Sequence, residues 1–182
     1  MRTTILFILA ASFLLALPVF GQTPYVAIFF DEDLQQTGRT PPGPAVIDTL
    51  FIVAGNFNMF ASSIEYRMEE NTDYLILLAD LVDFGTVEGH SYSGIRIHYD
   101  PPLDATADVL VERIIVMWVW EGMCRFVNVP LRIFPHPESG KIQAIRWPDL
   151  VPVEAVGHTA YICPTVPIEE TSWGRIKGLY ER

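Results

Sequence analysis

The stretch Met59–Met68, MFASSIEYRM, decides the fold class of this chain. Its residues alternate between two faces: Phe60, Ser62, Ile64, Tyr66 and Met68 share one, and Ser63, Glu65 and Arg67 share the other. A helix does not produce this period of two. The stretch is therefore predicted to be a half-buried β-strand, with Phe60 on the side that faces the core.

Similar short segments surround this strand, separated by Pro, Gly, Asn and Asp. They are Tyr25–Asp31, Val46–Ala54, Gly94–Tyr99 (ended by Pro101 and Pro102), Phe126–Phe134, Lys141–Trp147, Val151–Val156 and Thr159–Ile162. Val109–Trp120 is apolar on both faces and suits a central strand, although its length also allows a helix; Tyr74–Val82 fits a strand or a short helix. About nine or ten strands predict one all-β sandwich of immunoglobulin-like or related topology.

The first 21 residues, MRTTILFILAASFLLALPVFG, have the layout of a cleaved secretory signal. The apolar run is shorter than the roughly 20 residues of a membrane anchor, which is the alternative. We therefore expect a signal peptide at 1–21, a β-sandwich at 22–168 and a C-terminal helical tail at 169–182. The expected location is secreted, periplasmic or at the cell surface, with no membrane span after cleavage.

The formal net charge of −10 argues against nucleic acid as a partner, because an acidic chain is repelled by phosphates. Cys124 and Cys163 are the two cysteines, and in an oxidising compartment an even pair predicts one disulfide. The bond would close a loop of about 40 residues and contribute roughly 3–4 kcal/mol. Two buried free thiols are the alternative.

Asp31, Glu32 and Asp33 cluster at a predicted strand end, where their oxygens could hold Ca²⁺ together with Asp100. The alternative is a solvated turn that protects an edge strand. No other cofactor is expected. The four histidines, His90, His98, His136 and His158, lack the spacing of a zinc site and are expected on loops and the surface.

No reactive constellation of side chains emerges from the motifs. Trp147–Asp149 (WPD) and Ser139–Lys141 (SGK) both lack the partner residues of a phosphate-binding site, so each is interpreted as a turn. The strand-associated acids Glu65, Glu112 and Glu121 are expected to be solvated rather than catalytic. Trp118 and Trp120 share one face, and core packing is favoured over a platform for sugar binding.

The end of the chain carries the one convincing helical pattern. Thr171 or Ser172 can cap a helix in which Trp173, Ile176 and Tyr180 lie on one face. A helix this short is not stable alone. These three residues are therefore predicted to dock on the chain's own sandwich or on a neighbour.

Asp48–Glu69, DTLFIVAGNFNMFASSIEYRME, resembles the opening of cohesin-like modules, and Gly94–Pro102, GIRIHYDPP, is similar to a later strand of the same sandwich. The stretches Pro135–Asp149 and Ser172–Tyr180 also resemble small uncharacterised secreted bacterial proteins. The cohesin resemblance implies a non-catalytic module that binds a protein partner at the cell envelope. A carbohydrate-binding, lectin-like module and a small secreted hydrolase are the alternatives.

Overall fold

The computed structural model describes residues 23–119 and 128–164. These form strands and no helix, and none of them builds a helix able to cross a membrane. In chain order the strands are β1 (Tyr25–Phe29), β2 (Gly38–Arg39), β3 (Ile47–Gly55), β4 (Met59–Met68), β5 (Leu75–Leu81), β6 (Thr86–His90), β7 (Gly94–Ala105), β8 (Val109–Trp118), β9 (Val129–Phe134), β10 (Gln143–Arg146), β11 (Pro152–Glu154), β12 (Val156–Gly157) and β13 (Thr159–Ile162).

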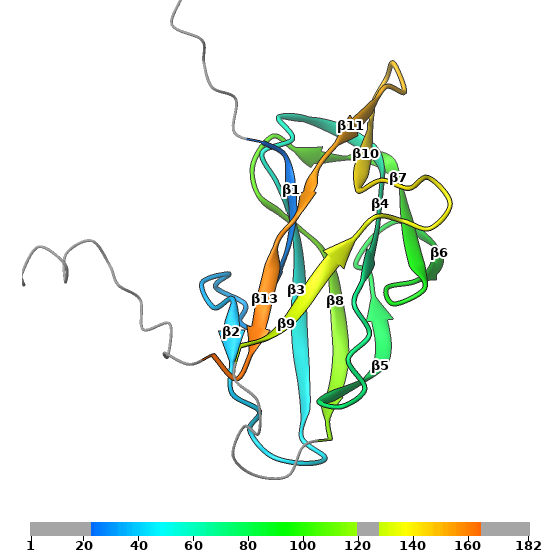
Figure 1. The fold of residues 1–182 in the computed structure, drawn as a ribbon. Helices are drawn as coiled ribbons and strands as arrows, with labels where there is room; N and C mark the ends of the chain where they lie inside the picture. The colour runs from blue at the N-terminus through cyan, green and yellow to red at the C-terminus, as the bar shows by residue number, and fades with distance from the viewer. Residues whose placement is uncertain (1–22, 120–127, 165–182) are drawn as a thin grey trace, which may run out of the picture.

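The strands form two sheets (Figure 1). The first sheet has the order β12-β1-β3-β8-β5, and the second runs β11-β10-β4-β9-β13-β2, with β7 beside β4 and β6 beside β7. One buried apolar cluster takes residues from both sheets, including Ile52 and Val116 from the first and Ile64 and Ile97 from the second. The predicted all-β sandwich is therefore confirmed.

The two segments with an ambiguous pattern are both strands. Tyr74–Val82 contains β5, and Val109–Trp120 contains β8, which lies between β3 and β5 as a central strand. Trp118 is fully buried, as expected of a core residue. The predicted C-terminal helix at 169–182, the signal segment at 1–21 and Trp120 lie outside the described residues.

Strand β4 has the predicted alternation only in its second half. Ile64, Tyr66 and Met68 are buried in the core, but Phe60 is 47% exposed, so its predicted orientation is wrong. The pairing of β4 with β7 shifts between Ala61 and Ser63, and this bulge reverses the phase of the strand. Met59 and Ala61 therefore enter the core in place of Phe60.

The predicted end of the strand at Pro101 and Pro102 is also wrong, because β7 continues to Ala105. Both prolines lie between His98, which pairs with Ser63, and Leu103, which pairs with Ala61. The ladder is interrupted there, so a residue without an N–H group removes no ladder hydrogen bond.

The reversed phase of β4 predicts that two truncations on the same strand differ strongly in their effect on stability. Ile64→Ala should lower the free energy of unfolding by about 2–5 kcal/mol, because it empties a fully buried site. Phe60→Ala should change it by no more than about 0.5 kcal/mol, as is usual on a surface. Urea unfolding of both variants measures this, and equal losses would contradict the bulge.

Candidate functional site

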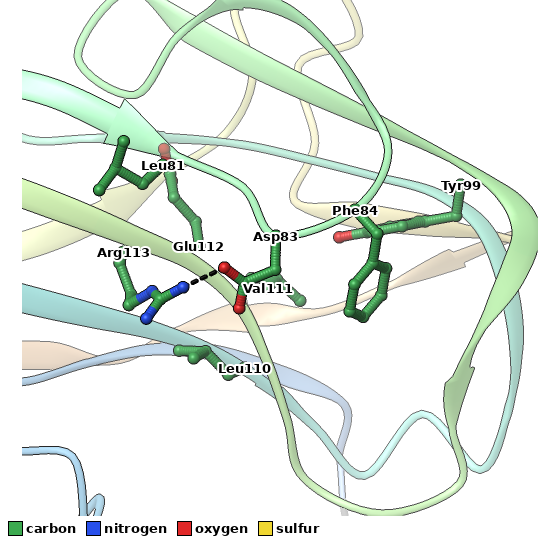
Figure 2. A pocket seen from close by; sticks show the side chains of 8 residues that line it. All are labelled: Leu81, Asp83, Phe84, Tyr99, Leu110, Val111, Glu112 and Arg113. Carbon is green, nitrogen blue, oxygen red and sulfur yellow. Dashed lines mark hydrogen bonds and ion pairs between the residues drawn. The ribbon is translucent and has the colours of Figure 1, made fainter.

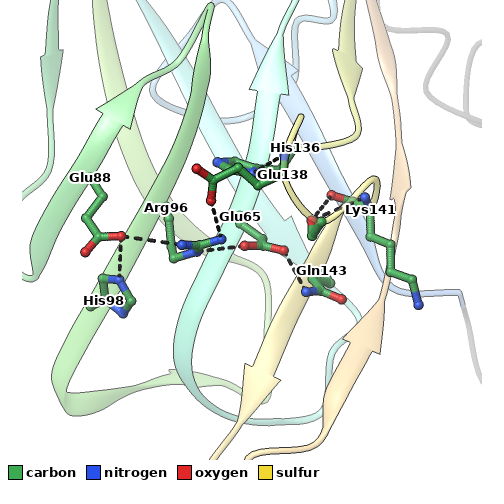
Figure 3. Close-up of polar contacts among 9 residues, drawn as sticks. Glu65, Glu88, Arg96, His98, His136, Glu138, Lys141 and Gln143 are labelled. Carbon is green, nitrogen blue, oxygen red and sulfur yellow. Dashed lines mark hydrogen bonds and ion pairs between the residues drawn. The ribbon is translucent and has the colours of Figure 1, made fainter.

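A row of polar side chains crosses the outer face of the second sheet (Figure 3). The strand registers place Glu88 of β6 opposite Arg96 of β7, Arg96 opposite Glu65 of β4, and Glu65 opposite Gln143 of β10. Neighbouring residues along β4 and β7 point into the core, so this row points outward. We call Glu65, Glu88, Arg96, Glu138 and Gln143 the Arg96 cluster.

Arg96 is the centre of this cluster, because its guanidinium contacts three carboxylates. Its Nε lies 2.8 Å from Glu65 Oε2, its Nη1 lies 3.5 Å from Glu88 Oε2, and its Nη2 lies 3.4 Å from Glu138 Oε2. The side chains of Glu88 and Glu138 are 61% and 74% exposed. The cluster therefore presents a net negative charge and free carboxylate lone pairs to solvent.

Glu65 is the buried anchor of the cluster, at 4% exposure. Burial alone raises the pKa of Glu65, but hydrogen bonds from Ser139 and Arg96 outweigh it and hold that pKa below its usual value. Gln143 Nε2 also donates to Glu65 Oε1 at 2.6 Å. Glu65 therefore stays ionised and holds Arg96 in place.

The loop between β9 and β10 covers this part of the sheet. It passes so close to β7 that a Cβ on Gly94 would lie 2.5 Å from Pro137 Cδ. The same loop buries His136, which is 5% exposed. The prediction of a solvated Glu65 is therefore wrong, because the covering loop is distant in sequence from the sheet it covers. His136 lies on a loop as expected, but it is buried against Gly94 and so is not a surface residue. Glu88, Arg96, His136 and Glu138 line a groove beside the loop.

Two exposed aromatic residues lie at the far end of this face. Phe60 on β4 is 47% exposed and Trp147, just after β10, is 52% exposed. Their backbones are adjacent, since Trp147 N donates to Phe60 O at 2.9 Å. Leu150 and Val151 in the β10–β11 connection are also exposed. We call Phe60 and Trp147 the Phe60–Trp147 patch.

A second group of acids is buried between the sheets. Glu112 on β8 is 1% exposed, and the Tyr66 hydroxyl of the opposite sheet donates to its Oε2. Ser91 Oγ lies 2.9 Å from Glu112 Oε1 and 2.6 Å from Asp80 Oδ1. Figure 2 shows Glu112 behind a small pocket that is lined also by Phe84, Tyr99 and the ion pair of Arg113 with Asp83.

The proton count explains how these acids share one site. Ser91 has a single hydroxyl proton, and if it is donated to Asp80, the contact with Glu112 needs a proton from the Glu112 carboxyl. Burial is the main reason that the pKa of Glu112 is raised to about 8. The hydrogen bond from Tyr66 lowers this pKa, and the negative charge of Asp80 raises it. Glu112 is therefore mainly protonated at neutral pH.

The expectation that Glu112 is solvated is thus wrong. Its position on a central strand that is apolar on both faces was the available signal, because a carboxylate there has no route to solvent. The network joins the two sheets through Tyr66 and Glu112. We interpret it as a structural contact, since Glu112 and Ser91 are both at most 1% exposed and a substrate would not reach them.

The residues singled out in the sequence are not gathered into one site. The Asp31 carboxylate accepts hydrogen bonds from the backbone N–H groups of Gln35 (3.0 Å) and Gln36 (2.7 Å). Within 23–119 and 128–164, no three His, Cys, Asp or Glu side chains form a group suited to a metal ion, and calcium binding by Asp31, Glu32 and Asp33 stays a prediction.

The other predicted residues depend on segments outside the description. Cys163 is buried and no cysteine in the described ranges is free, but Cys124 lies outside them, and so the pairing stays a prediction. Trp173, Ile176 and Tyr180 also lie outside the described residues. Their role in docking is not tested by the structure.

The fold resembles cohesin modules. One is the cohesin of a type I cohesin–dockerin complex from Clostridium thermocellum, with a TM-score of 0.51, 13% identity, and coverage of 78% of this chain and 94% of that chain. Another is the seventh ScaB type I cohesin of Pseudobacteroides cellulosolvens, with a TM-score of 0.50, 9% identity, and coverage of 81% and 97%.

A third is a cohesin module from a Clostridium perfringens family 33 glycoside hydrolase, with a TM-score of 0.50, 8% identity, and coverage of 78% and 98%. No protein-family model matches this chain, and a search of curated proteins also finds no match. The similarity therefore concerns the fold, and agrees with the resemblance seen in Asp48–Glu69.

The buried acid predicts a pH-dependent stability. The pKa of Glu112 rises from its ordinary 4.5 to about 8 on folding, so the folded state keeps a proton that the unfolded chain loses. The contribution of Glu112 to the free energy of unfolding is therefore fully present below the unfolded-state pKa of 4.5. It falls by up to about 1.4 kcal/mol per pH unit as the pH rises from there to the folded-state pKa of about 8.

Glu112→Gln should flatten this part of the dependence, because an amide does not titrate. Urea unfolding between about pH 5 and pH 8 gives the difference between wild type and variant at each pH. Glu154→Gln on β11, whose side chain is 64% exposed, is the matched control and should run parallel to wild type. A constant difference between wild type and Glu112→Gln would contradict the assignment.

Proposed function

We propose that this protein is a secreted, non-catalytic β-sandwich module that binds a protein partner through the outer face of its second sheet. The observation that carries the proposal is the combination of the negatively charged Arg96 cluster with the exposed Phe60–Trp147 patch on the same face. Trp, Tyr and Arg dominate the residues that supply binding energy at protein interfaces. Exposed apolar patches on a soluble domain also mark such interfaces.

The negative charge on the outer face of the second sheet favours a positively charged partner. Arg96 is already engaged by three carboxylates, and Glu88 and Glu138 keep exposed oxygens. A partner with Lys or Arg side chains at matching positions would pair with these oxygens, and an acidic partner would be repelled. The chain's net charge of −10 favours encounter with the same kind of partner.

The structural neighbours support a protein as the partner. The Clostridium thermocellum neighbour was solved as a cohesin–dockerin complex, and the same type of binding is part of this proposal by analogy of fold. The carbohydrate-binding and hydrolase alternatives are less well supported, because the structural neighbours named above are cohesin modules.

The remaining expectations complete the proposal. Residues 1–21 serve as a cleaved signal that delivers the protein to the periplasm, the cell surface or the medium. Residues 22–168 form the sandwich, and residues 169–182 form a helical tail.

Cys124 and Cys163 form a disulfide in the compartment to which the signal delivers the protein. Mass spectrometry after alkylation, with and without prior reduction, tests the bond, and two labelled thiols without reduction would contradict it.

Replacing the patch should weaken partner binding without unfolding the domain. The wild-type domain is immobilised and used to capture proteins from the envelope fraction of the native organism, and the captured protein is then purified. Phe60→Ala combined with Trp147→Ala should weaken its binding by about 2 kcal/mol or more, which is typical of interface hot spots. Isothermal titration calorimetry measures the change.

Tyr161→Ala provides the matched control, because Tyr161 is an exposed aromatic residue on β13 of the same sheet, beyond β9 from β4. It should bind like wild type. The affinity of the wild-type domain should also fall as salt is added, since the proposed contacts are between opposite charges. Unchanged binding by the Phe60/Trp147 variant would refute the assignment of the face.

A further inference from the structure

The outer face of the first sheet is a continuous apolar surface. The strand registers align its side chains in rows, with Ile47, Met117 and Ile76 in one row and Thr49, Ile115 and Ala79 in the next. Phe29, Phe51, Arg113 and Leu81 form the third row. None of these residues belongs to the core cluster or packs against it, because the alternate residues along each strand fill the core.

This face differs in kind from the outer face of the second sheet. Arg113 is the one charged residue in the three rows of the first sheet, and its guanidinium is already paired with Asp83. Ile47, Ile76 and Leu81 are each more than 40% exposed. The outer face of an antiparallel sheet is usually polar when it faces water, so a face that is apolar over four strands is typical of a sheet that packs against another layer.

The described chain ends near one edge of this sheet. Cys163 N donates to Arg39 O at 2.9 Å, and Arg39 Nε lies 3.0 Å from Asp48 Oδ2. Asp48 follows Ile47, at the end of β3 where the first apolar row begins. The Asp48 carboxylate points to the core side, where it also accepts a hydrogen bond from Trp118 Nε1, so the described chain ends at the edge of the sandwich near the start of β3, across the first sheet from the first apolar row.

The length and composition of this segment match the surface. The three rows extend for about 14 Å along the strands and about 15 Å across them, while Trp173 to Tyr180 would span about 11 Å of a helix over 169–182. Its predicted apolar face carries Trp173, Ile176 and Tyr180. Four residues, 165–168, lie between Pro164 and the predicted helix, which allows a span of up to about 17 Å before the helix begins.

We propose that residues 169–182 pack against the outer face of the first sheet of their own chain, with Trp173, Ile176 and Tyr180 on the rows of Ile115 and Met117. The segment then forms a third layer of the sandwich and leaves the second sheet open. This inference does not rest on the proposed function, because it concerns the opposite face.

Tryptic cleavage tests the proposal, since the segment contains Arg175 and Lys177. In the full chain, cleavage after these residues should be at least about tenfold slower than in the variant Ile115→Thr/Met117→Gln, because packing must open before the protease can act. Leu150→Gln/Val151→Thr changes exposed apolar residues of the second sheet and should be cleaved like wild type. Equal cleavage rates for all three proteins would overturn the proposal.

The concentration dependence of the protection identifies what covers the face. Packing within one chain predicts a monomeric mass by sedimentation and a cleavage rate that does not change with dilution. A doubled mass, together with protection that is lost on dilution, would show that a second copy covers the face and would overturn the proposal.

A second variant keeps the test decisive if the sheet substitutions unfold the domain. Trp173→Ser/Ile176→Ser changes only the segment, so the core residues of the sandwich are untouched. Uncovering the apolar rows should increase the fluorescence of the dye ANS several-fold over wild type at the same protein concentration. Unchanged ANS fluorescence in a folded variant would also overturn the proposal.

Discussion

The pairing of β4 with β7 is the constraint on which the rest of the structure depends. Its register sets Ile64 opposite Ile97 and Tyr66 opposite Ile95 on the core side, and Glu65 opposite Arg96 on the outer side. A slip of one residue would exchange these faces and bury the ion pair in the core. The same register directs the Tyr66 hydroxyl to Glu112 of the other sheet, so the charged outer row and the buried polar contact have one origin.

The molecule thereby separates two uses of acidic side chains. Glu112 is buried without a cationic partner and avoids the cost of an isolated charge by holding a proton. Glu65, almost as buried, avoids that cost in the opposite way, because Arg96 and neighbouring donors stabilise its ionised form. The first acid joins the sheets and weakens that junction as the pH rises. The second fixes Arg96, which leaves Glu88 and Glu138 as the carboxylates available to a partner.

Local patterns were sufficient for the strands and the fold class but not for the details that form the site. The alternation in Met59–Met68 predicted a strand correctly, and Val109–Trp120, for which a helix was also open, is the central strand β8. The orientation of Phe60 was mispredicted because a bulge depends on the partner strand, and a single sequence does not reveal it. Glu65 was mispredicted for a related reason, since the loop that covers it comes from a segment about seventy residues further along the chain, and His136 of that loop is buried only because the loop packs against Gly94 of β7.

The central claim is that the outer face of the second sheet is the binding face, and chemical-shift mapping tests it most directly. The ¹⁵N-labelled domain is titrated with the captured partner and the backbone amide shifts are followed by NMR. The account predicts the largest changes at Phe60, Arg96 and Trp147 and their neighbours on β4, β6, β7 and β10. Changes confined to β1, β3, β8 and β5, with the second sheet unaffected, would contradict it.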